Sequence, residues 1–215
     1  MNSAGVAAGK NIKMPHAIDD KILLLASEGH IVPDRSMLKT PAQIEEIKKS
    51  AALNTAVLDH VAKHIHAGMS TAEIDKLVYD YTTEHGGIPA PLGYDGFPKS
   101  VCTSINNEVC HGIPDENIIL EEGDIINVDV STILNGYYSD ASRMFAIGEL
   151  SDRAKKILKV TEECVELGLA AAKTLGASRG YCRCNQLTRS GKRLTLWLKT
   201  SAVTESVLNF TKNLL

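Results

Sequence analysis

The chain has 215 residues and a formal net charge of −3, a length sufficient for one domain with a substantial core. This charge leaves no basic surface typical of proteins that bind nucleic acid or anionic membranes, so we expect neither partner. The five cysteines are an odd number without a C-x-x-C pair, which argues against a disulfide framework and against a thiolate zinc site.

The first 39 residues are expected to form a loosely ordered extension. Glycines at positions 5, 9 and 29 and prolines at 15 and 33 interrupt any periodicity. The apolar run at 22–26 is too short to span a membrane and lacks the flanks of a secretory signal. We therefore expect a cytoplasmic protein without a membrane segment.

Two helices follow this extension. Thr40 and Pro41 predict the N-cap and first position of a helix that runs towards Gly68. Ser70 and Glu73 predict a capping box for a second helix, which ends at 85–87. The expected apolar positions are Ile44, Ile47, Ala51, Leu58 and Val61 in the first helix and Ile74, Leu77, Val78 and Tyr81 in the second.

Shorter elements are predicted after the second helix. Prolines and glycines at 89–98 indicate a constrained loop, which leads into a short strand at 100–104. The chain then turns at 105–108 and returns through 109–114. A last helix is expected at 150–175, with Ser151 as its N-cap and an apolar face of Ile157, Val160, Cys164, Leu167 and Ala171.

The pair Asn135-Gly136 lies between two apolar segments and predicts a β-hairpin with a type I′ turn. In that register Leu134 pairs with Tyr137 and Ser131 lies opposite Asp140. Asp129 is two residues before Ser131, so it shares a face with Asp140 at a diagonal position, where backbones are roughly 7–8 Å apart. A register shifted by one residue would place the two carboxylates on opposite faces.

Two converging carboxylates repel each other unless a cation or a shared proton lies between them. Oxygen ligands on a stiff hairpin suit one divalent metal ion, or two ions about 3.5–4 Å apart. The alternative is that Asp129 and Asp140 are solvated strand or turn residues, and their spacing alone does not decide between the two.

His111 is the histidine that the sequence favours for proton or hydrogen-bond chemistry, since Gly112 and Pro114 constrain the backbone beside it. A purely structural loop histidine is the alternative. His64 and His66 are two residues apart and do not share a helical face, so we expect them to be surface residues.

Three segments resemble the type I methionine aminopeptidases of bacterial or organellar kind: YDGFPKSVCTSINNEVCHGIP at 94–114, GDIINVDVS at 123–131 and YYSDASRMF at 137–145. The resemblance runs from near Thr40 to about Lys173. It implies an α+β chain with the N-terminal half of the duplicated, aminopeptidase/creatinase-like pita-bread fold. In that family a two-metal site lies between the halves, and a metal-activated water removes the initiator methionine of new polypeptides when a small residue follows.

The resemblance also implies roles for individual residues. Asp129 matches a metal-chelating aspartate, and Asp140 matches the aspartate that bridges both metals. His111 matches a histidine that is not a ligand and that hydrogen-bonds the scissile amide. The methionine pocket would be lined by Tyr94, Phe97 and Cys102. The cofactors implied are two divalent ions, from among cobalt, manganese, iron and zinc.

The residues after Lys173 do not follow the family pattern, and the family's remaining ligands, one histidine and two glutamates, are not found. If the codons for Thr195 to Leu215 are read one nucleotide earlier, ordinary codon choices allow YSVAEDFCGHGIGFKFHKEPF. This peptide resembles the family's second-half strand with its histidine ligand. We therefore expect a frameshift or sequencing error between about Lys173 and Leu194, and we expect Cys182 and Cys184 not to form a metal site.

The expected organisation is an extension at 1–39, part of the catalytic domain at 40–175 and an out-of-frame tail at 176–215. We expect doubtful metal binding and little or no activity from the chain as written. Its partners would be nascent peptide N-termini, with the ribosome as a further possibility, and the intact form would be a monomer. The alternatives are an enzyme of the X-Pro aminopeptidase or prolidase branch, and a metal-free pita-bread binding module.

Overall fold

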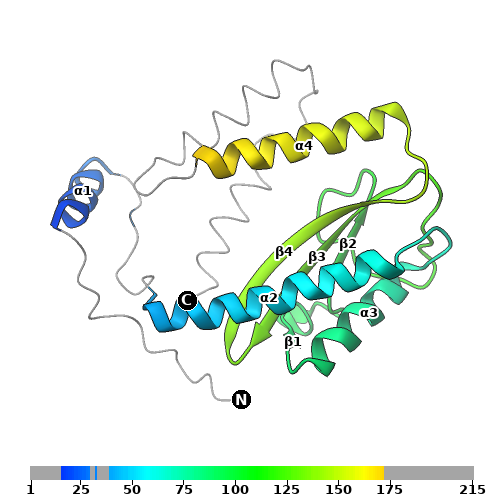
Figure 1. Cartoon of the computed structure of the whole chain (residues 1–215), viewed down its shortest axis with the longest axis horizontal. Coiled ribbons are helices and arrows are strands. Elements are labelled where there is room, and N and C mark those ends of the chain that lie inside the picture. The colour runs from blue at the N-terminus through cyan, green and yellow to red at the C-terminus, as the bar shows by residue number, and fades with distance from the viewer. Residues whose placement is uncertain (1–15, 30–31, 33–38, 172–215) are drawn as a thin grey trace.

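The computed structural model describes residues 16–29, 32 and 39–171, and every structural statement below refers to these residues (Figure 1). The predicted features at 1–15, 30–31, 33–38 and 172–215, including Cys182 and Cys184, lie outside this range. The elements are α1 (His16–Ser27), α2 (Pro41–His64), α3 (Thr71–Glu84), β1 (Ile88–Pro89), a 3-10 turn η2 (Tyr94–Gly96), β2 (Cys102–Ile105), β3 (Ile125–Leu134), β4 (Tyr137–Ala146) and α4 (Asp152–Ala171).

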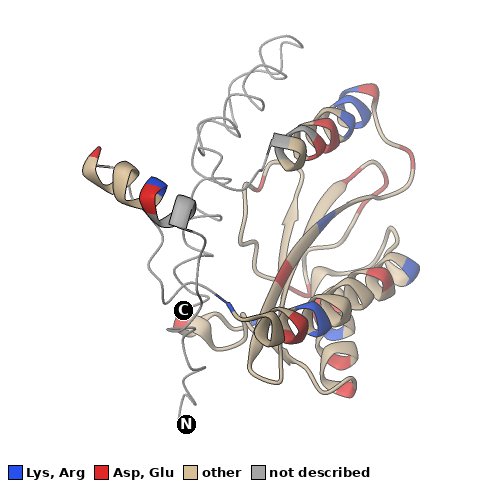
Figure 2. Ribbon diagram, turned by 60° about the vertical axis from the view of Figure 1, so that its left-hand side comes forward, with Lys and Arg blue, Asp and Glu red and all other residues tan. Residues whose placement is uncertain are grey.

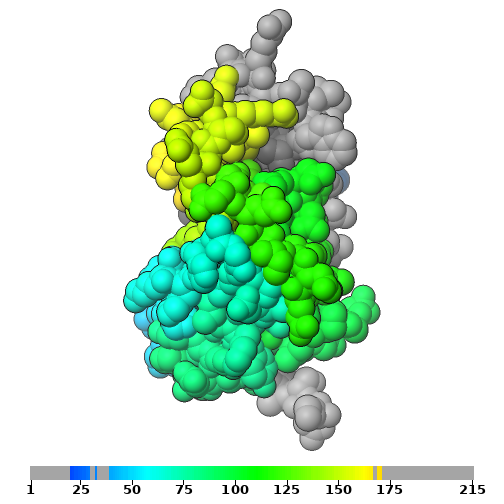
Figure 3. Space-filling model, turned by 90° about the vertical axis from the view of Figure 1, so that its right-hand side faces the viewer, coloured from blue at the N-terminus to red at the C-terminus, as the bar shows by residue number. Residues whose placement is uncertain are grey.

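The centre of the fold is the antiparallel pair of strands β3 and β4. Strand β3 also pairs in antiparallel fashion with β1 and β2, so β3 is the interior strand of a four-stranded sheet. Helix α2 lies across this sheet and α3 lies beside α2, as Figures 1 and 3 show. Charged residues gather on the helices, whereas the strands carry few of them (Figure 2).

The core lies between α2, α3 and one face of the sheet. Alternate residues of β3 point into it, because successive side chains of a strand face opposite sides. The buried apolar side chains are Leu53, Val57, Leu58 and Val61 of α2, Ile74 and Val78 of α3, and Ile126, Val128 and Val130 of β3, joined by Met69, Val101, Leu120, Phe145 and Ile147.

Polar side chains attach the first half of α2 to the hairpin. The Asn54 side-chain amide donates to the Val130 carbonyl at 2.9 Å and accepts from the Thr132 hydroxyl at 3.0 Å. The Ser50 hydroxyl lies 2.8 Å from that of Ser139. These buried groups all have partners, which removes the free-energy cost of burying them.

The predicted apolar face of α2 is therefore wrong at its beginning. Ile44 is 42% exposed, and Ala51 is also exposed. The polar residues Gln43, Ser50 and Asn54 are buried instead. Hydrogen bonds to the strands determine which side of the helix faces inwards here, and a count of apolar spacings does not detect them.

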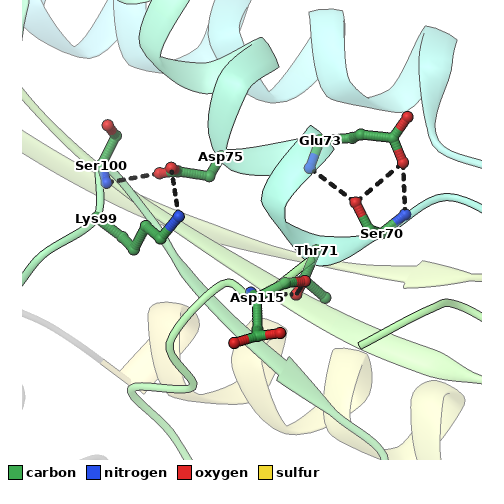
Figure 4. Close-up of polar contacts among 7 residues, drawn as sticks. All are labelled: Ser70, Thr71, Glu73, Asp75, Lys99, Ser100 and Asp115. Atoms are coloured by element: carbon green, nitrogen blue, oxygen red, sulfur yellow. Dashed lines mark hydrogen bonds and ion pairs between the residues drawn. The ribbon is translucent and has the colours of Figure 1, made fainter. Parts of the chain in front are cut away.

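The predicted Thr40 N-cap and the predicted Ser70–Glu73 capping box are confirmed, and Thr40 also forms a capping box that was not predicted. Thr40 accepts from the backbone N–H of Gln43, whose side chain accepts from Thr40 N–H. Ser70 and Glu73 make the same reciprocal pair at the start of α3 (Figure 4). Each pair satisfies two N–H groups that have no partner within the helix.

The prediction of a loosely ordered N-terminal extension is wrong for His16–Ser27, which forms α1. This stretch contains neither glycine nor proline and is rich in strong helix formers. Two residues after the helix, Gly29 has a φ of 79°, which is typical of the position that follows a helix C-terminus. Leu23 and Leu24 are 68% and 57% exposed, and α1 lies apart from the sheet in Figures 1 and 2.

Helix α4 confirms the predicted last helix within the described residues. The Ser151 hydroxyl accepts from the backbone N–H of Ala154 at 3.3 Å, as expected of an N-cap. Val160 is 4% exposed, and Ile157 and Cys164 are half-buried. None of the helices within the described part of the chain is both long and apolar enough to cross a membrane.

Candidate functional site

The hairpin has the predicted register. Asn135 and Gly136 have φ values of 53° and 83°, the left-handed conformations that a type I′ turn requires. Leu134 pairs with Tyr137, and Ser131 lies opposite Asp140. Asp129 is therefore one diagonal step from Asp140 on the same face of the sheet.

This face is the one that α2 and α3 do not cover. Ile126, Val128 and Val130 of β3 point to the covered face and are fully buried. Asp129, between two of them, points the other way and is half-buried, and Asp140 is exposed. The two carboxylates consequently lie on a rigid sheet surface that solvent can reach.

The two carboxyl groups interact strongly. Burial, together with the charge and the hydrogen bonding of Asp140, raises the pKa of Asp129 to about 7. The Ser131 hydroxyl donates to Asp140 Oδ1 at 2.8 Å. A cation bound nearby would lower the pKa of Asp129 and favour its ionised form.

Cys102 completes this group from the neighbouring strand. In the β2–β3 pairing it lies directly opposite Asp129. Its free thiol is half-buried, and burial raises its pKa to about 12, with smaller contributions from Asp129, Cys110 and Asp140. The side chain therefore remains an uncharged, soft surface beside the carboxylates.

His111 lies in the loop that follows β2, and its side chain is exposed. The next residue, Gly112, packs directly on β2: its carbonyl accepts from Thr103 N–H at 2.9 Å and its own N–H donates to the Ser104 hydroxyl at 3.2 Å. A Cβ atom at Gly112 would lie 1.9 Å from the Thr103 carbonyl oxygen. Gly112 thus holds the backbone beside His111, whose φ of 56° the sequence did not reveal.

Tyr94 and Phe97 lie on the loop between β1 and β2. Both ends of this loop adjoin the carboxylate face, because Ala90 N–H donates to the Ser131 carbonyl at 2.9 Å and the other end enters β2. Tyr94 is 62% exposed and Phe97 is half-buried. The structure thus brings Cys102 next to the carboxylates and places both aromatic residues on the loop that borders them.

The same loop is attached to α3 by one aspartate. Asp75 accepts from Ser100 N–H at 2.6 Å and pairs with Lys99 at 3.6 Å (Figure 4). Asp115, further along the chain, is tied to the start of α3 by a reciprocal pair of hydrogen bonds with Thr71, at 2.9 and 3.0 Å. These contacts position the segments on either side of β2.

Few side chains that could bind a metal ion lie close together. Within the described residues, no three or more His, Cys, Asp or Glu side chains are grouped so that they could hold a metal ion. His64 and His66 are exposed, as predicted. From the sequence, Ser131 was expected only to lie opposite Asp140 in the register and was not predicted as its hydrogen-bond partner. Its position directly opposite Asp140 in the predicted register is the sequence feature that could have indicated this hydrogen bond.

Comparison with known proteins gives a consistent result. Residues 45–189 match the description "Metallopeptidase family M24". This match ends beyond Lys173, where the resemblance was expected to end. "Methionine aminopeptidase A" of Synechocystis sp. is 48% identical over 143 residues, which are 66% of this chain and 56% of that protein. "Methionine aminopeptidase" of Escherichia coli is 40% identical over 137 residues, which are 63% and 52% of the two chains.

Solved structures show the same likeness. The methionine aminopeptidase of Thermotoga maritima has a TM-score of 0.67 at 33% identity, covering 72% of this chain and 62% of that one. An Xaa-Pro dipeptidase of Bacillus anthracis, at 23% identity and a TM-score of 0.63, shares the fold and covers 73% and 42%. The predicted pita-bread half-fold is confirmed for the described residues. The chain spans about half the length of the curated relatives it matches.

Proposed function

Because this chain belongs to the metallopeptidase family M24, we propose that it carries part of the active site of a methionine aminopeptidase. Such an enzyme removes the initiator methionine from a new polypeptide whose second residue is small. The observation that carries the proposal is the placement of Asp129 and Asp140 together on the open face of the sheet. Relatives of 40–48% identity that bear this enzyme's name support the substrate class.

Asp129 and Asp140 would hold divalent metal ions. Their carboxylates fit such ions, since a cation beside them removes the repulsion by Asp140 that, together with burial, raises the pKa of Asp129. Manganese, iron, cobalt and zinc all accept carboxylate ligands, and two ions would occupy the complete site. Divalent ions supply Lewis acidity and lower the pKa of water to near neutrality. The Ser131 hydroxyl orients the Asp140 carboxylate for this role.

The remaining residues would bind and orient the substrate. His111 would hydrogen-bond the scissile amide, an interaction that strengthens as charge develops on the carbonyl oxygen. Cys102, uncharged beside the carboxylates, together with Tyr94 and Phe97 would line a pocket for the methionine thioether. The substrates would be nascent chains in the cytosol, with ribosome contact and a monomeric intact form as further parts of the proposal.

The X-Pro aminopeptidase and prolidase branch is not favoured. Three solved structures from that branch are 18–23% identical to this chain, so their likeness shows the fold alone. A metal-free binding module would have no need of a carboxylate pair whose two members repel each other.

We further propose that the 215-residue chain has little or no aminopeptidase activity. Two carboxylates hold a metal ion weakly, since affinity grows with the number of preorganised ligands. Domain boundaries at 1–39, 40–175 and 176–215, with a frameshift between about Lys173 and Leu194, belong to the same proposal. Resequencing this region in independent reads tests it, and an uninterrupted present frame would exclude a sequencing error.

The metal proposal is tested with Mn²⁺ and the full-length chain. We expect weak Mn²⁺ binding, measured by electron paramagnetic resonance, that Asp129→Asn and Asp140→Asn abolish. Asp80→Asn is the matched control, because Asp80 is a carboxylate on α3 that pairs with Lys76, remote from the hairpin. Equal binding by all three variants would show that the hairpin carboxylates are not the ligands.

Activity is tested separately, by release of methionine from Met-Ala-Ser. We expect little or no release by the present chain and substantial release by a chain whose frame is restored. In the restored chain, His111→Ala should lower kcat more than it raises KM. Rapid hydrolysis by the present chain would contradict the proposed inactivity, and cleavage of Ala-Pro in place of Met-Ala-Ser would contradict the substrate class.

A further inference from the structure

Four side-chain rings on α2, α3 and the C-cap of α3 contact one another in a row, with the two contacts of Tyr81 stacked and the His60–His64 contact tilted, and we call this row the ring ladder. The ring centres are 4.3 Å apart from His64 to His60, 4.6 Å from His60 to Tyr81 and 4.1 Å from Tyr81 to His85. His64 and His85 are exposed, whereas His60 and Tyr81 are half-buried. The ladder belongs to the helices that cover the sheet face opposite the carboxylates. Stacking against Tyr81 restricts the rotation of the His60 ring.

Hydrogen bonds define which ring nitrogen of the outer histidines is free. His64 Nδ1 lies 2.8 Å from the His60 carbonyl oxygen, and His85 Nδ1 lies 2.8 Å from the Tyr81 carbonyl oxygen. A carbonyl oxygen only accepts, so Nδ1 carries the proton and the lone pair lies on Nε2. Histidines that bind metals in proteins are commonly held in this way, with the other ring N–H donating to a carbonyl. The Nε2 atom of His64 is therefore prepared to act as a ligand.

The spacing of His60 and His64 suits a chelate. Residues four apart lie on one helix face, and this is the spacing of the two zinc-binding histidines in the H-E-x-x-H motif. With metal–nitrogen bonds of about 2.0–2.1 Å, two imidazoles at adjacent positions around one ion have ring centres about 4.5–5 Å apart. The separation of 4.3 Å is close to this range, so a small rotation of the exposed His64 side chain would bring both nitrogens to one ion while the His60 ring stays in place.

We propose that His60 and His64 form a surface chelate for a divalent transition-metal ion, with Cu²⁺ bound most tightly, ahead of Ni²⁺ and Zn²⁺. Water completes the coordination, because the described residues include no group of three or more candidate ligands. The site is distinct from Asp129 and Asp140 in position and in chemistry, since imidazole favours softer ions than paired carboxylates do.

The charges around His60 agree with this assignment. Burial holds its pKa below the ordinary value, and His64, Lys63 and His85 act in the same direction, while the carboxylate of Glu84 opposes them. The ring is consequently neutral at neutral pH, as a ligand must be. The nearby Glu84 carboxylate also offsets part of the charge that a bound cation adds.

The test is Cu²⁺ binding by the full-length chain at pH 7, followed by calorimetric titration and by the nitrogen hyperfine pattern in electron paramagnetic resonance. His64→Gln and His60→Gln are compared with His66→Gln. His66 is a matched control, because it is exposed and its Nδ1 also bonds a backbone carbonyl, at 2.7 Å, but it has no histidine four residues away. Circular dichroism verifies that every variant remains folded.

We expect the His64 variant to bind Cu²⁺ at least about tenfold more weakly than the His66 variant, a difference equivalent to about 1.4 kcal/mol. The hyperfine pattern should change from two nitrogens to one. Asp129→Asn should leave this binding unchanged, which separates the chelate from the proposed Mn²⁺ site. Equal Cu²⁺ affinity of the His64 and His66 variants, or a loss of Cu²⁺ binding in Asp129→Asn, would overturn the inference.

Discussion

Replacing Asp129 with asparagine tests the electrostatics of the candidate site directly. The substitution keeps the size of the side chain and removes its ability to ionise. Burial and the neighbouring Asp140 raise the pKa of Asp129 from 3.8 to about 7. The folded, metal-free protein therefore keeps a proton that the unfolded chain loses near pH 4. Between pH 4 and 7 the folded state binds more protons, so the free energy of unfolding falls as pH rises.

The magnitude follows from the same pKa values. A displacement from 3.8 to about 7 is equivalent to about 4 kcal/mol at the upper end of the window. Asp129 is half-buried, so solvent reduces this effect, and we expect about 2–4 kcal/mol. His60 affects the free energy of unfolding in the opposite direction. Its pKa is lowered in the folded protein, so below its ordinary pKa the unfolded chain binds the proton more readily and stability rises with pH. Only the difference in the free energy of unfolding between the parent chain and Asp129→Asn isolates the contribution of the Asp129 carboxyl group.

The assay is urea unfolding followed by circular dichroism at pH 5, 6, 7 and 8, with a chelator present throughout. The parent chain should lose about 1–2.5 kcal/mol relative to Asp129→Asn between pH 5 and pH 8, because the remainder of the loss falls below pH 5. Asp80→Asn is the control and should follow the parent chain. If the free energies of unfolding of the parent chain and of Asp129→Asn change with pH in parallel, the raised pKa of Asp129 is refuted. A gain in stability of the parent relative to Asp129→Asn as pH rises would refute it as well.

Three further predictions concern the support of the site. Asn54→Ala leaves a buried carbonyl and a buried hydroxyl of the hairpin without their partner, and it should cost about 2–3 kcal/mol in urea unfolding; the exposed Thr55→Ala is its control and should change little. Gly112→Ala places a methyl group 1.9 Å from the backbone of β2. It should lower the thermal midpoint by several degrees, and an unchanged midpoint would contradict the close packing. Ser131→Ala removes the hydrogen bond to Asp140 and should weaken Mn²⁺ binding about tenfold, with unfolding in urea unaffected.

The local elements were predictable because their causes lie within a few residues. Thr40 and Ser70 with their partners three residues later define helix starts through hydrogen bonds that close within one turn. Asn135 and Gly136 define the hairpin because both adopt positive φ. Once that turn is set, the alternation of the strands places Asp129 and Asp140 on one face.

Longer-range features were not predictable in this way. The inner face of α2 depends on hydrogen bonds from Ser50 and Asn54 to strand residues that are 89 and 76 positions away in the sequence. Apolar periodicity therefore indicated Ile44, which is exposed. Helix α1 was missed because breakers on either side of it outweighed the strong helix formers within it.

The amino-acid sequence by itself determined the hairpin, its register and the pairing of two carboxylates, because a two-residue turn transmits its geometry along both strands. Only the tertiary structure decided that Cys102 lies opposite Asp129, that Gly112 holds the His111 backbone against β2, and that the carboxylate face is the one α2 and α3 leave open. The reason is physical. Turn geometry acts over a few bonds, whereas strand pairing and the choice of buried face depend on which distant surfaces exclude water together.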